Sequence, residues 1–176
     1  IININKPKGP TSHQTSSYLK QILGVKKCGH SGTLDPKVTG VLPIAIGRAT
    51  RIVQVLLLTG KEYIAIMHLH KKVPGDVIKK VCNEFVGKIK QVPPLRSSVK
   101  RRERTREICY LDILEIIEQD VLFKVGCQAG TYIRKLCYDI GQKIGTGAHM
   151  AELIRTRVGP FTTETMCTLQ DVADAY

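Results

Sequence analysis

The stretch GHSGTLDPKVTGVL, residues 29–42, decides how the rest of this chain is interpreted. Gly, Ser and Thr are frequent here and periodicity is weak, which predicts a loop over residues 25–40 that leads into a buried strand over residues 41–46. Its Asp35 is the single acidic residue among residues 1–61, which also hold nine Lys and Arg. Nearby positive charge favours the ionised form of a carboxylate, which suits a nucleophile or a general base.

Asp35 followed by Pro36 has a second interpretation. The pair is typical of a turn in which the carboxylate accepts a hydrogen bond from a nearby backbone N–H. Spacing alone does not choose between a turn former and a catalytic carboxylate, so both interpretations stay open at this point.

Composition sets the class of protein. A chain of 176 residues with 43% hydrophobic and 24% charged residues predicts one globular domain. The longest aliphatic stretch, residues 52–58, is far shorter than the roughly 18 residues of a membrane span. Six cysteines form no CxxC pair, and Cys28 and His30 make only a weak zinc half-site, so we expect reduced cysteines, no metal and an intracellular protein. The missing initiator Met suggests a start inside a longer chain.

Charge is distributed unevenly along the sequence. Residues 1–106 hold 21 Lys and Arg against five acids, whereas residues 107–176 hold six against ten. This asymmetry predicts a polyanionic partner, with nucleic acid as the first candidate. Seven positive charges and one acid fall in residues 90–106, the basic segment, which we expect to be an extended loop because Pro93-Pro94 is incompatible with a helix.

The remaining pattern mixes helices and strands without regular βαβ alternation, which indicates the α+β class. Strands are expected over residues 1–5, 41–46, 61–70, 107–117, 121–127 and 161–166. Helices are expected over residues 11–24, 49–58, 76–87, 130–141, 148–154 and 168–176. Tyr63 then falls on a strand, on the same side as Ala65 and Met67, and Arg134 falls in a first helical turn.

Several kinds of chemistry lack their motifs. The sequence has no GxxxxGK[ST], no GxGxxG after a strand, no GxSxG and no HExxH, which argues against nucleotide hydrolysis, dinucleotide binding and two classes of hydrolase. His68 and His70 face one side of a predicted strand, but no Cys or carboxylate falls at ligand spacing, so ordinary histidines are the better interpretation. We therefore expect chemistry on side chains, with no cofactor and no metal.

Residues 29–42 closely resemble the catalytic loop of TruB-type pseudouridine synthases. Further motifs of that family follow in its order: Lys6-Pro7-x-Gly9, Lys61-x-Tyr63, Gln91-Val92-Pro93-Pro94 with Lys100, Gly130-Thr131-Tyr132-Ile133-Arg134, and Gly147-Ala148-His149-x-x-x-Leu153. Lys37 and residues 94–101 and 148–161 resemble the dyskerin branch, the catalytic protein of box H/ACA ribonucleoproteins. The resemblance implies a catalytic domain over residues 1–176, with a mixed, mainly antiparallel sheet, flanking helices and a central cleft. The family's C-terminal PUA domain is absent from this sequence.

The resemblance also implies roles for individual residues. Asp35 would be the obligatory carboxylate of an RNA uridine isomerase, as a nucleophile or as a base; Arg134 would pair with it, and Tyr63 would stack on the extruded base. The implied substrate-binding residues are His30, Lys37, Leu153, Arg96, Lys100, Arg101, Arg102 and Arg104. A core tyrosine at position 63 and a phosphate-binding or surface arginine at position 134 remain alternatives.

The implied partners are guide RNA, substrate RNA and the small companion proteins of the box H/ACA particle, with no membrane and no nucleotide cofactor. The expected substrate is rRNA, with tRNA as a second target, and the compact ends favour an archaeal, cytoplasmic protein over a nucleolar one. One alternative is a stand-alone tRNA synthase of the TruB kind, which the short basic segment disfavours. Another is a silent RNA-binding or ribosome-assembly scaffold, which has no need of a carboxylate in a basic groove.

Overall fold

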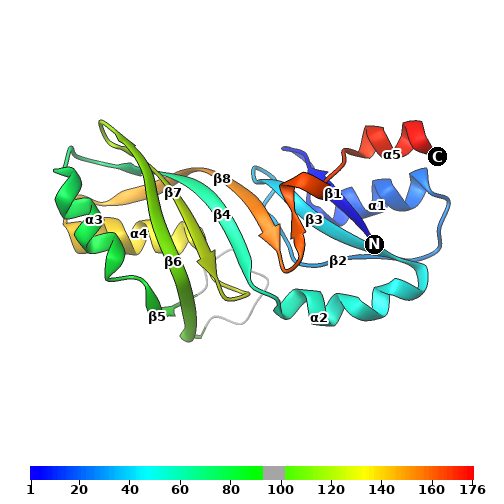
Figure 1. Cartoon of the computed structure of the whole chain (residues 1–176), viewed down its shortest axis with the longest axis horizontal. Helices are drawn as coiled ribbons and strands as arrows, with labels where there is room; N and C mark the ends of the chain where they lie inside the picture. Colours follow the sequence, from blue (N-terminus) through cyan, green and yellow to red (C-terminus); the bar gives the residue numbers. More distant parts are fainter. Residues whose placement is uncertain (93–101) are drawn as a thin grey trace. The chain divides into compact units, whose positions relative to one another are not determined.

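Our computed structural model describes residues 1–92 and 102–176. The chain forms two compact units, one from residues 1–61 and 154–176 and the other from residues 62–153 (Figure 1). Strands β4 (Lys61–Leu69) and β8 (Ala148–Val158) each have residues in both units. Helices and strands mix as expected, so the α+β class is confirmed.

In the first unit, a small sheet is built around one strand. The central strand β3 (Thr39–Ile46) pairs antiparallel with β1 (Ile2–Lys6) and β2 (Cys28–His30), and parallel with β8 at Ile154 and Arg155. The other elements are α1 (Ser12–Ile22), η1 (Gly47–Ile52), α2 (Val53–Leu58), β9 (Phe161–Thr162), η2 (Thr163–Thr165) and α5 (Leu169–Ala175). Ile4, Leu19, Leu42 and Ile44 form a fully buried core between the sheet and α1, with residues of α5 against it.

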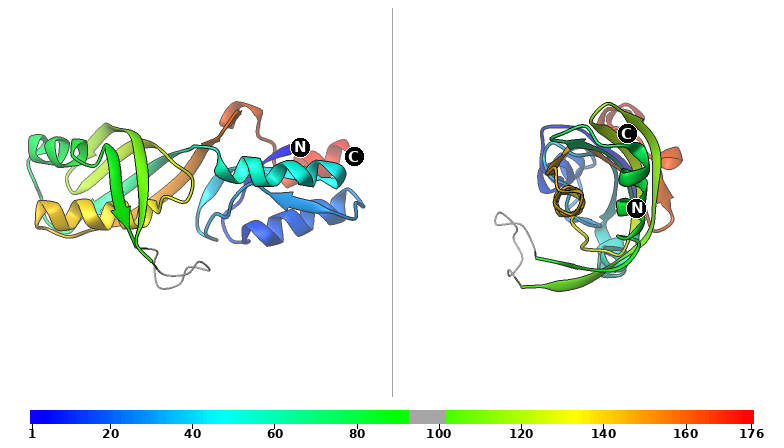
Figure 2. Two further views of the ribbon diagram at one scale, coloured as in Figure 1. Left: turned by 90° about the horizontal axis from the view of Figure 1, so that it is seen from below. Right: turned by 90° about the vertical axis from the view of Figure 1, so that its left-hand side faces the viewer.

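The second unit is a sheet covered by two helices. Its strand order is β8–β4–β7–β6–β5, in which β5 (Gly87–Gln91), β6 (Arg104–Ile117) and β7 (Asp120–Cys127) pair antiparallel. Helices α3 (Gly75–Asn83) and α4 (Ile133–Ile144) lie side by side (Figure 2, left). Apolar residues of both helices share one core with the strands, because each helix is apolar on one face only.

The main error in the predicted elements concerns residues 148–154, which form the first part of strand β8 and not a helix. The local sequence Ala148-His149-Met150-Ala151-Glu152-Leu153 is rich in good helix formers, which explains the prediction. In the folded chain, β8 has hydrogen-bonded strands beside it, β3 and β4, and this tertiary pairing outweighs local propensity.

Smaller differences concern short elements. The predicted loop over residues 25–40 contains the three-residue strand β2, which is too short to show a period. The predicted helix over residues 49–58 begins as the 3₁₀ helix η1, and the predicted edge strand over residues 161–166 is reduced to β9 followed by η2. The helix starts at Thr11 and Thr168 are confirmed, each with a capping box.

Two features are absent from the described residues. In the described ranges, no helix is long and apolar enough to cross a membrane. No group of three or more His, Cys, Asp or Glu side chains among the same residues is arranged to hold a metal ion.

Candidate active site

Asp35 lies in an exposed turn between two buried anchors. Leu34 and Val38 are 4% and 3% exposed, whereas Asp35, Pro36 and Lys37 between them are exposed. The backbone N–H of Val38 donates to the carbonyl of Asp35 at 2.9 Å, which closes the turn with Pro36 at its second position. The turn itself is therefore confirmed, closed by a backbone hydrogen bond, and the catalytic role of the exposed Asp35 side chain stays a prediction.

The residue before Asp35 is held by a hydroxyl from the start of α1. Ser12 is fully buried, and its Oγ accepts a hydrogen bond from the backbone N–H of Leu34 at 2.8 Å and donates to the carbonyl of Leu34 at 3.2 Å. One side chain thus satisfies both backbone groups of a buried loop residue, which would otherwise lack partners. This contact ties the Asp35 turn to a helix.

Lys6 holds the other side of the turn. Its side chain is fully buried at the end of β1, and its ammonium donates to the carbonyls of Pro7 at 2.9 Å, Pro36 at 3.3 Å and Val38 at 2.9 Å. Burial lowers the pKa of Lys6, the nearby Arg155 lowers it further, and Asp35 acts in the opposite direction. Lys6 is therefore both a backbone clamp and an electrostatic neighbour of the carboxylate.

Arg155 is the second buried cation of this unit. It is 1% exposed, and its guanidinium donates from Nε to the carbonyl of Val41 at 2.8 Å and from Nη2 to the carbonyl of Gly32 at 3.1 Å. Arg155 reaches this position because β8 lies very close to β3. This close approach requires glycine at position 40, since a Cβ there would lie 2.2 Å from the carbonyl oxygen of Arg155.

Lys61 is the third buried cation. At the first position of β4, its ammonium donates to the carbonyls of Leu56, Leu57 and Thr59 at 3.1, 2.9 and 2.6 Å, around the C-terminal end of α2. A cation is favourable there because the last carbonyls of a helix lack intrahelical partners. The unit that holds Asp35 thus buries three cations against backbone carbonyls, and their positive charge attracts anionic groups.

His30 ends strand β2 and is half-buried opposite Ile44. Burial lowers the pKa of its imidazole, and the charges of Arg155 and His13 act in the same direction, so the neutral ring is favoured at neutral pH. Its Nδ1 is buried and has no hydrogen-bond partner among the residues that the structure describes. A buried ring nitrogen without a partner is unusual, because most buried polar atoms in folded proteins are hydrogen-bonded.

Tyr63 and Leu153 belong to the second unit. Tyr63 lies on β4, and both side chains are partly buried against the core that contains Ala65 and Met67. The predicted strand position of Tyr63 is confirmed. Leu153 reaches the same core from a strand, whereas we expected a helix.

Arg134 lies in the first turn of α4, as predicted. The start of this helix is fixed by Gln91, which is 2% exposed: the Tyr132 backbone N–H donates to Oε1 of Gln91 at 3.0 Å, and Nε2 of Gln91 donates to the Tyr132 carbonyl at 3.1 Å. The end of β5 therefore positions the helical turn that carries Arg134.

The basic segment is not one extended loop. Its ends belong to the paired strands β5 and β6, and Lys90 forms an ion pair with Glu103 at 3.1 Å. Arg104 begins β6 and is half-buried, and Arg102 before it is exposed. Arg96, Lys100 and Arg101 lie outside the described residues.

The candidate site residues divide between the two units. Asp35, His30 and Lys37 share one loop region of the first unit. The second unit holds Tyr63, Arg134, Leu153, Arg102 and Arg104. The pairing of Arg134 with Asp35 stays a prediction.

Comparison with known proteins decides the family. Residues 20–133 match the family described as "TruB family pseudouridylate synthase (N terminal domain)", and residues 134–176 match the "tRNA pseudouridylate synthase B C-terminal domain". The chain belongs to the TruB family. This result agrees with the resemblance of residues 29–42 to the TruB catalytic loop.

Archaeal relatives of this TruB-family chain are close in sequence. It is 62% identical to "Probable tRNA pseudouridine synthase B" of Methanopyrus kandleri and 58% identical to the protein of the same name from Methanosarcina barkeri. Each match covers 100% of this chain and 52% of the relative. The chain therefore spans about half the length of the curated relatives it matches.

The TruB-family chain is similar to solved structures from H/ACA ribonucleoproteins. It is similar to a chain of a Cbf5-Nop10-Gar1 complex, with a TM-score of 0.95 and 59% identity over 98% of this chain and 53% of the other. It is also similar to a chain of an H/ACA RNP bound to a substrate RNA containing 2′-deoxyuridine, with a TM-score of 0.91 and 55% identity over 98% and 52%. The expected resemblance to the H/ACA branch is confirmed.

Sequence reasoning on this TruB-family chain missed the supporting residues. The family motifs include Lys6, Lys61 and Gln91 without a role for any of them, Ser12 falls near the start of the helix expected over residues 11–24, and no role is expected for Arg155. A signal for three of them is present: Lys6, Lys61 and Gln91 are each the first residue of a motif, beside a chain break where backbone carbonyls or N–H groups need partners. No local pattern indicates that Arg155 is buried on a strand.

Proposed function

We propose that this chain carries the catalytic part of an RNA pseudouridine synthase, which converts uridine within RNA to pseudouridine. The observation that carries the proposal is the exposed Asp35 turn, clamped by Ser12 and Lys6 in a chain of the TruB family. A turn that is rigid on both sides presents its side chain in a defined place, as a catalytic group requires.

The reaction is an isomerisation that needs no net oxidant or reductant. The N1–C1′ bond breaks, a C5–C1′ bond forms, C5 loses its proton and N1 ends protonated. In this proposal the Asp35 carboxylate attacks the ribose or base, or abstracts a proton, and the Arg134 guanidinium pairs with it and holds it ionised. Tyr63 stacks on the extruded base, and Leu153 forms an apolar wall.

Guided action is the version that the comparisons favour. Chains at 55–59% identity to this one are found in a Cbf5-Nop10-Gar1 complex and in an H/ACA RNP that holds substrate RNA. We therefore propose guide RNA, substrate RNA and small companion proteins as partners, in the cytoplasm of an archaeal cell. The names of the curated relatives support a second candidate, a tRNA pseudouridine synthase.

The test is a uridine-to-pseudouridine assay on rRNA fragments and on tRNA, each with and without a box H/ACA guide RNA and the companion proteins. Product in rRNA that depends on the guide supports the guided enzyme. Product in tRNA without a guide supports the second candidate. If none of the four combinations yields product, the proposal of a pseudouridine synthase fails.

A further inference from the structure

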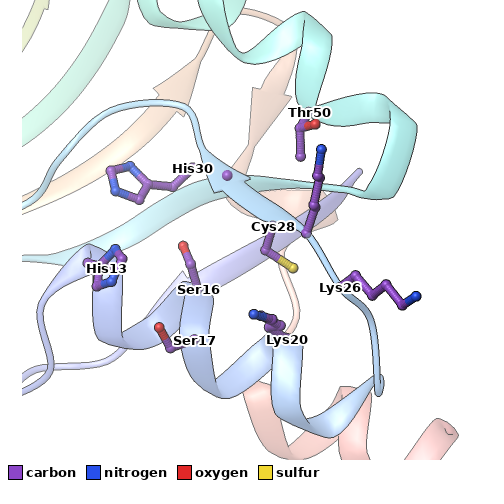
Figure 3. Close-up of a pocket in the computed structure, with 10 residues that line it drawn as sticks. His13, Ser16, Ser17, Lys20, Lys26, Cys28, His30 and Thr50 are labelled. Carbon is purple, nitrogen blue, oxygen red and sulfur yellow. The ribbon is translucent and has the colours of Figure 1, made fainter.

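We propose that an open pocket between α1 and β2 binds backbone phosphates of the single-stranded substrate RNA beside the target uridine. The proposal rests on the proposed function and names the ligand of a surface next to the Asp35 loop. The pocket has a volume of about 650 Å³ and lies entirely in the first unit (Figure 3). We call it the lysine pocket; it is lined by His13, Ser16, Ser17, Lys20, Lys26, Lys27, Cys28, Gly29, His30 and Thr50.

The charge of the lysine pocket is the first reason. Lys20, Lys26 and Lys27 line it, and no Asp or Glu does. Within the part of the chain that the structure describes, none of these three lysines forms an ion pair, although other lysines do, such as Lys72 with Glu118. Three cations in one pocket repel one another, so an anion that enters it is favoured.

The arrangement of the lysines favours a chain of phosphates over a single one. Figure 3 shows Lys20 on the helix and Lys26 on the segment before β2, with their ammonium groups apart. A site for one phosphate gathers its donors at one point, commonly in a glycine-rich loop before a helix, and this sequence has no such motif. Cations spread along a pocket fit the successive phosphates of a strand.

The polar wall of the pocket supports the same ligand. The Ser16 hydroxyl donates to the carbonyl of Ser12 at 3.0 Å and the Thr50 hydroxyl donates to the carbonyl of Gly47 at 2.8 Å, so neither proton is available to a ligand. The ammonium groups, the imidazoles and the Ser17 hydroxyl remain as donors toward the pocket, which suits an anion.

The position of the pocket connects it with the reaction. His30 lines the pocket and precedes Asp35 by five residues, which can span at most about 18 Å. The phosphates held by Lys20, Lys26 and Lys27 would therefore belong to nucleotides close to the uridine that meets Asp35. This places the lysine pocket on the path of the substrate strand.

The test compares two triple variants of equal net charge. Lys20→Ala, Lys26→Ala and Lys27→Ala remove the lysines of the pocket, and Lys71→Ala, Lys79→Ala and Lys88→Ala remove three exposed lysines of the second unit as the control. The probe is a short single-stranded RNA that contains one uridine, used alone for binding and, for the rate, together with a box H/ACA guide RNA and the companion proteins. Its affinity is measured over a series of salt concentrations, together with the single-turnover rate of pseudouridine formation at saturating RNA.

We expect the pocket variant to bind the probe more weakly. The slope of log affinity against log salt concentration should become shallower by up to about 2, because each of three lost single-strand phosphate contacts contributes about 0.7 to that slope. The control variant should keep both the salt slope and the single-turnover rate of the unchanged protein. A third variant with arginine at all three positions should restore the slope, and a thermal melt checks that each variant is folded.

Three results would overturn the proposal: an unchanged salt slope in the pocket variant, an equal loss in the control variant, or weaker binding of guide RNA while the substrate strand keeps its affinity. The last result would assign the phosphates to the guide. If the unchanged protein forms no pseudouridine, the proposed function fails, whereas the salt slopes still decide whether the pocket binds RNA.

Discussion

Among single residues, those that hold the Asp35 turn in place contribute to the stability of the fold, whereas Asp35 itself is expected to contribute to the chemistry. Ser12 and Lys6 are buried and bind the backbone of residues 34–38 with their polar atoms, whereas the Asp35 side chain is exposed. Loss of a buried partner leaves carbonyls unsatisfied, at about 1–3 kcal/mol each. Substitutions of the supporting residues should therefore reduce stability, and substitution of Asp35 should affect the chemistry.

The first prediction concerns Asp35→Asn. We expect it to abolish product formation while RNA binding stays similar or tightens, because the lost charge is negative and lies where phosphates approach. Pseudouridine formation and RNA affinity measured on the same preparation check this. Asp76→Asn, an exposed acid on α3, is the control and should keep full activity. Turnover of the Asp35→Asn variant within a few-fold of the unchanged protein would contradict the catalytic role.

The second prediction concerns His30 and pH. Burial lowers the pKa of His30 below its ordinary 6.5, with help from Arg155 and His13, so the unfolded chain binds more protons than the folded chain just below pH 6.5. The free energy of unfolding should therefore fall as the pH decreases through 6.5 toward the folded-state pKa, and level off below it. Urea unfolding of the unchanged protein and of His30→Gln between about pH 5 and 8 checks this. If the free energy of unfolding changes equally with pH in both proteins, His30 contributes nothing to the pH dependence of stability.

At the scale of elements, close packing of two strands decides where Arg155 lies. β3 and β8 pair in parallel through Thr39 with Ile154 and Gly40 with Arg155. Gly40 has a φ of +109°, and its Cα lies against the backbone of Arg155. A side chain at position 40 is therefore unfavourable for two reasons: the positive φ favours glycine, and the backbone of Arg155 leaves no space for a Cβ. The contact of Arg155 with the loop at Gly32 depends on this crossing.

The third prediction is that Gly40→Ala destabilises the protein by about 3 kcal/mol or more, because a Cβ would overlap the carbonyl of Arg155 and the φ is unfavourable. Gly24→Ala is the matched control: Gly24 also has a positive φ, +58°, but its Cβ would meet nothing within 4 Å. It should cost about 1 kcal/mol from conformation alone. Urea unfolding midpoints compare the two, and similar losses would remove the steric explanation.

At the scale of the whole molecule, the division into units changes the distribution of charge. Residues 1–106 and 107–176 differ sharply in charge along the sequence, but the first unit holds 11 Lys and Arg against four acids, and the second 16 against 11. The acid-rich residues of β6 and β7 share a unit with the lysines of α3 and β5. Both units are thus net basic, which suits a polyanionic partner that contacts each of them.

The fourth prediction concerns metals. If Asp35 and its neighbours carry the chemistry, pseudouridine formation should survive extended chelation with unchanged single-turnover rates. The assay uses protein dialysed against a strong chelator, with the folded state followed by circular dichroism. Loss of activity on chelation, followed by its recovery when zinc is added back, would contradict side-chain catalysis.

Much of this protein could be predicted from its sequence alone. The α+β class, the Asp35 turn, the strand position of Tyr63 and the helical position of Arg134 all follow from local signals: glycine and proline breaks, alternation and caps. These signals depend on residues within a few positions of one another, so no knowledge of the folded chain is needed. The family motifs added the expected chemistry.

Tertiary structure alone decided the rest. Residues 148–154 form a strand because β3 and β4 offer hydrogen bonds that local propensity does not describe. Arg155 is buried because its guanidinium donates to the carbonyls of Val41 and Gly32, which lie 114 and 123 positions away in the sequence. Long-range pairing determines both outcomes, since the free energy of a buried polar group depends on the partners that the fold brings to it.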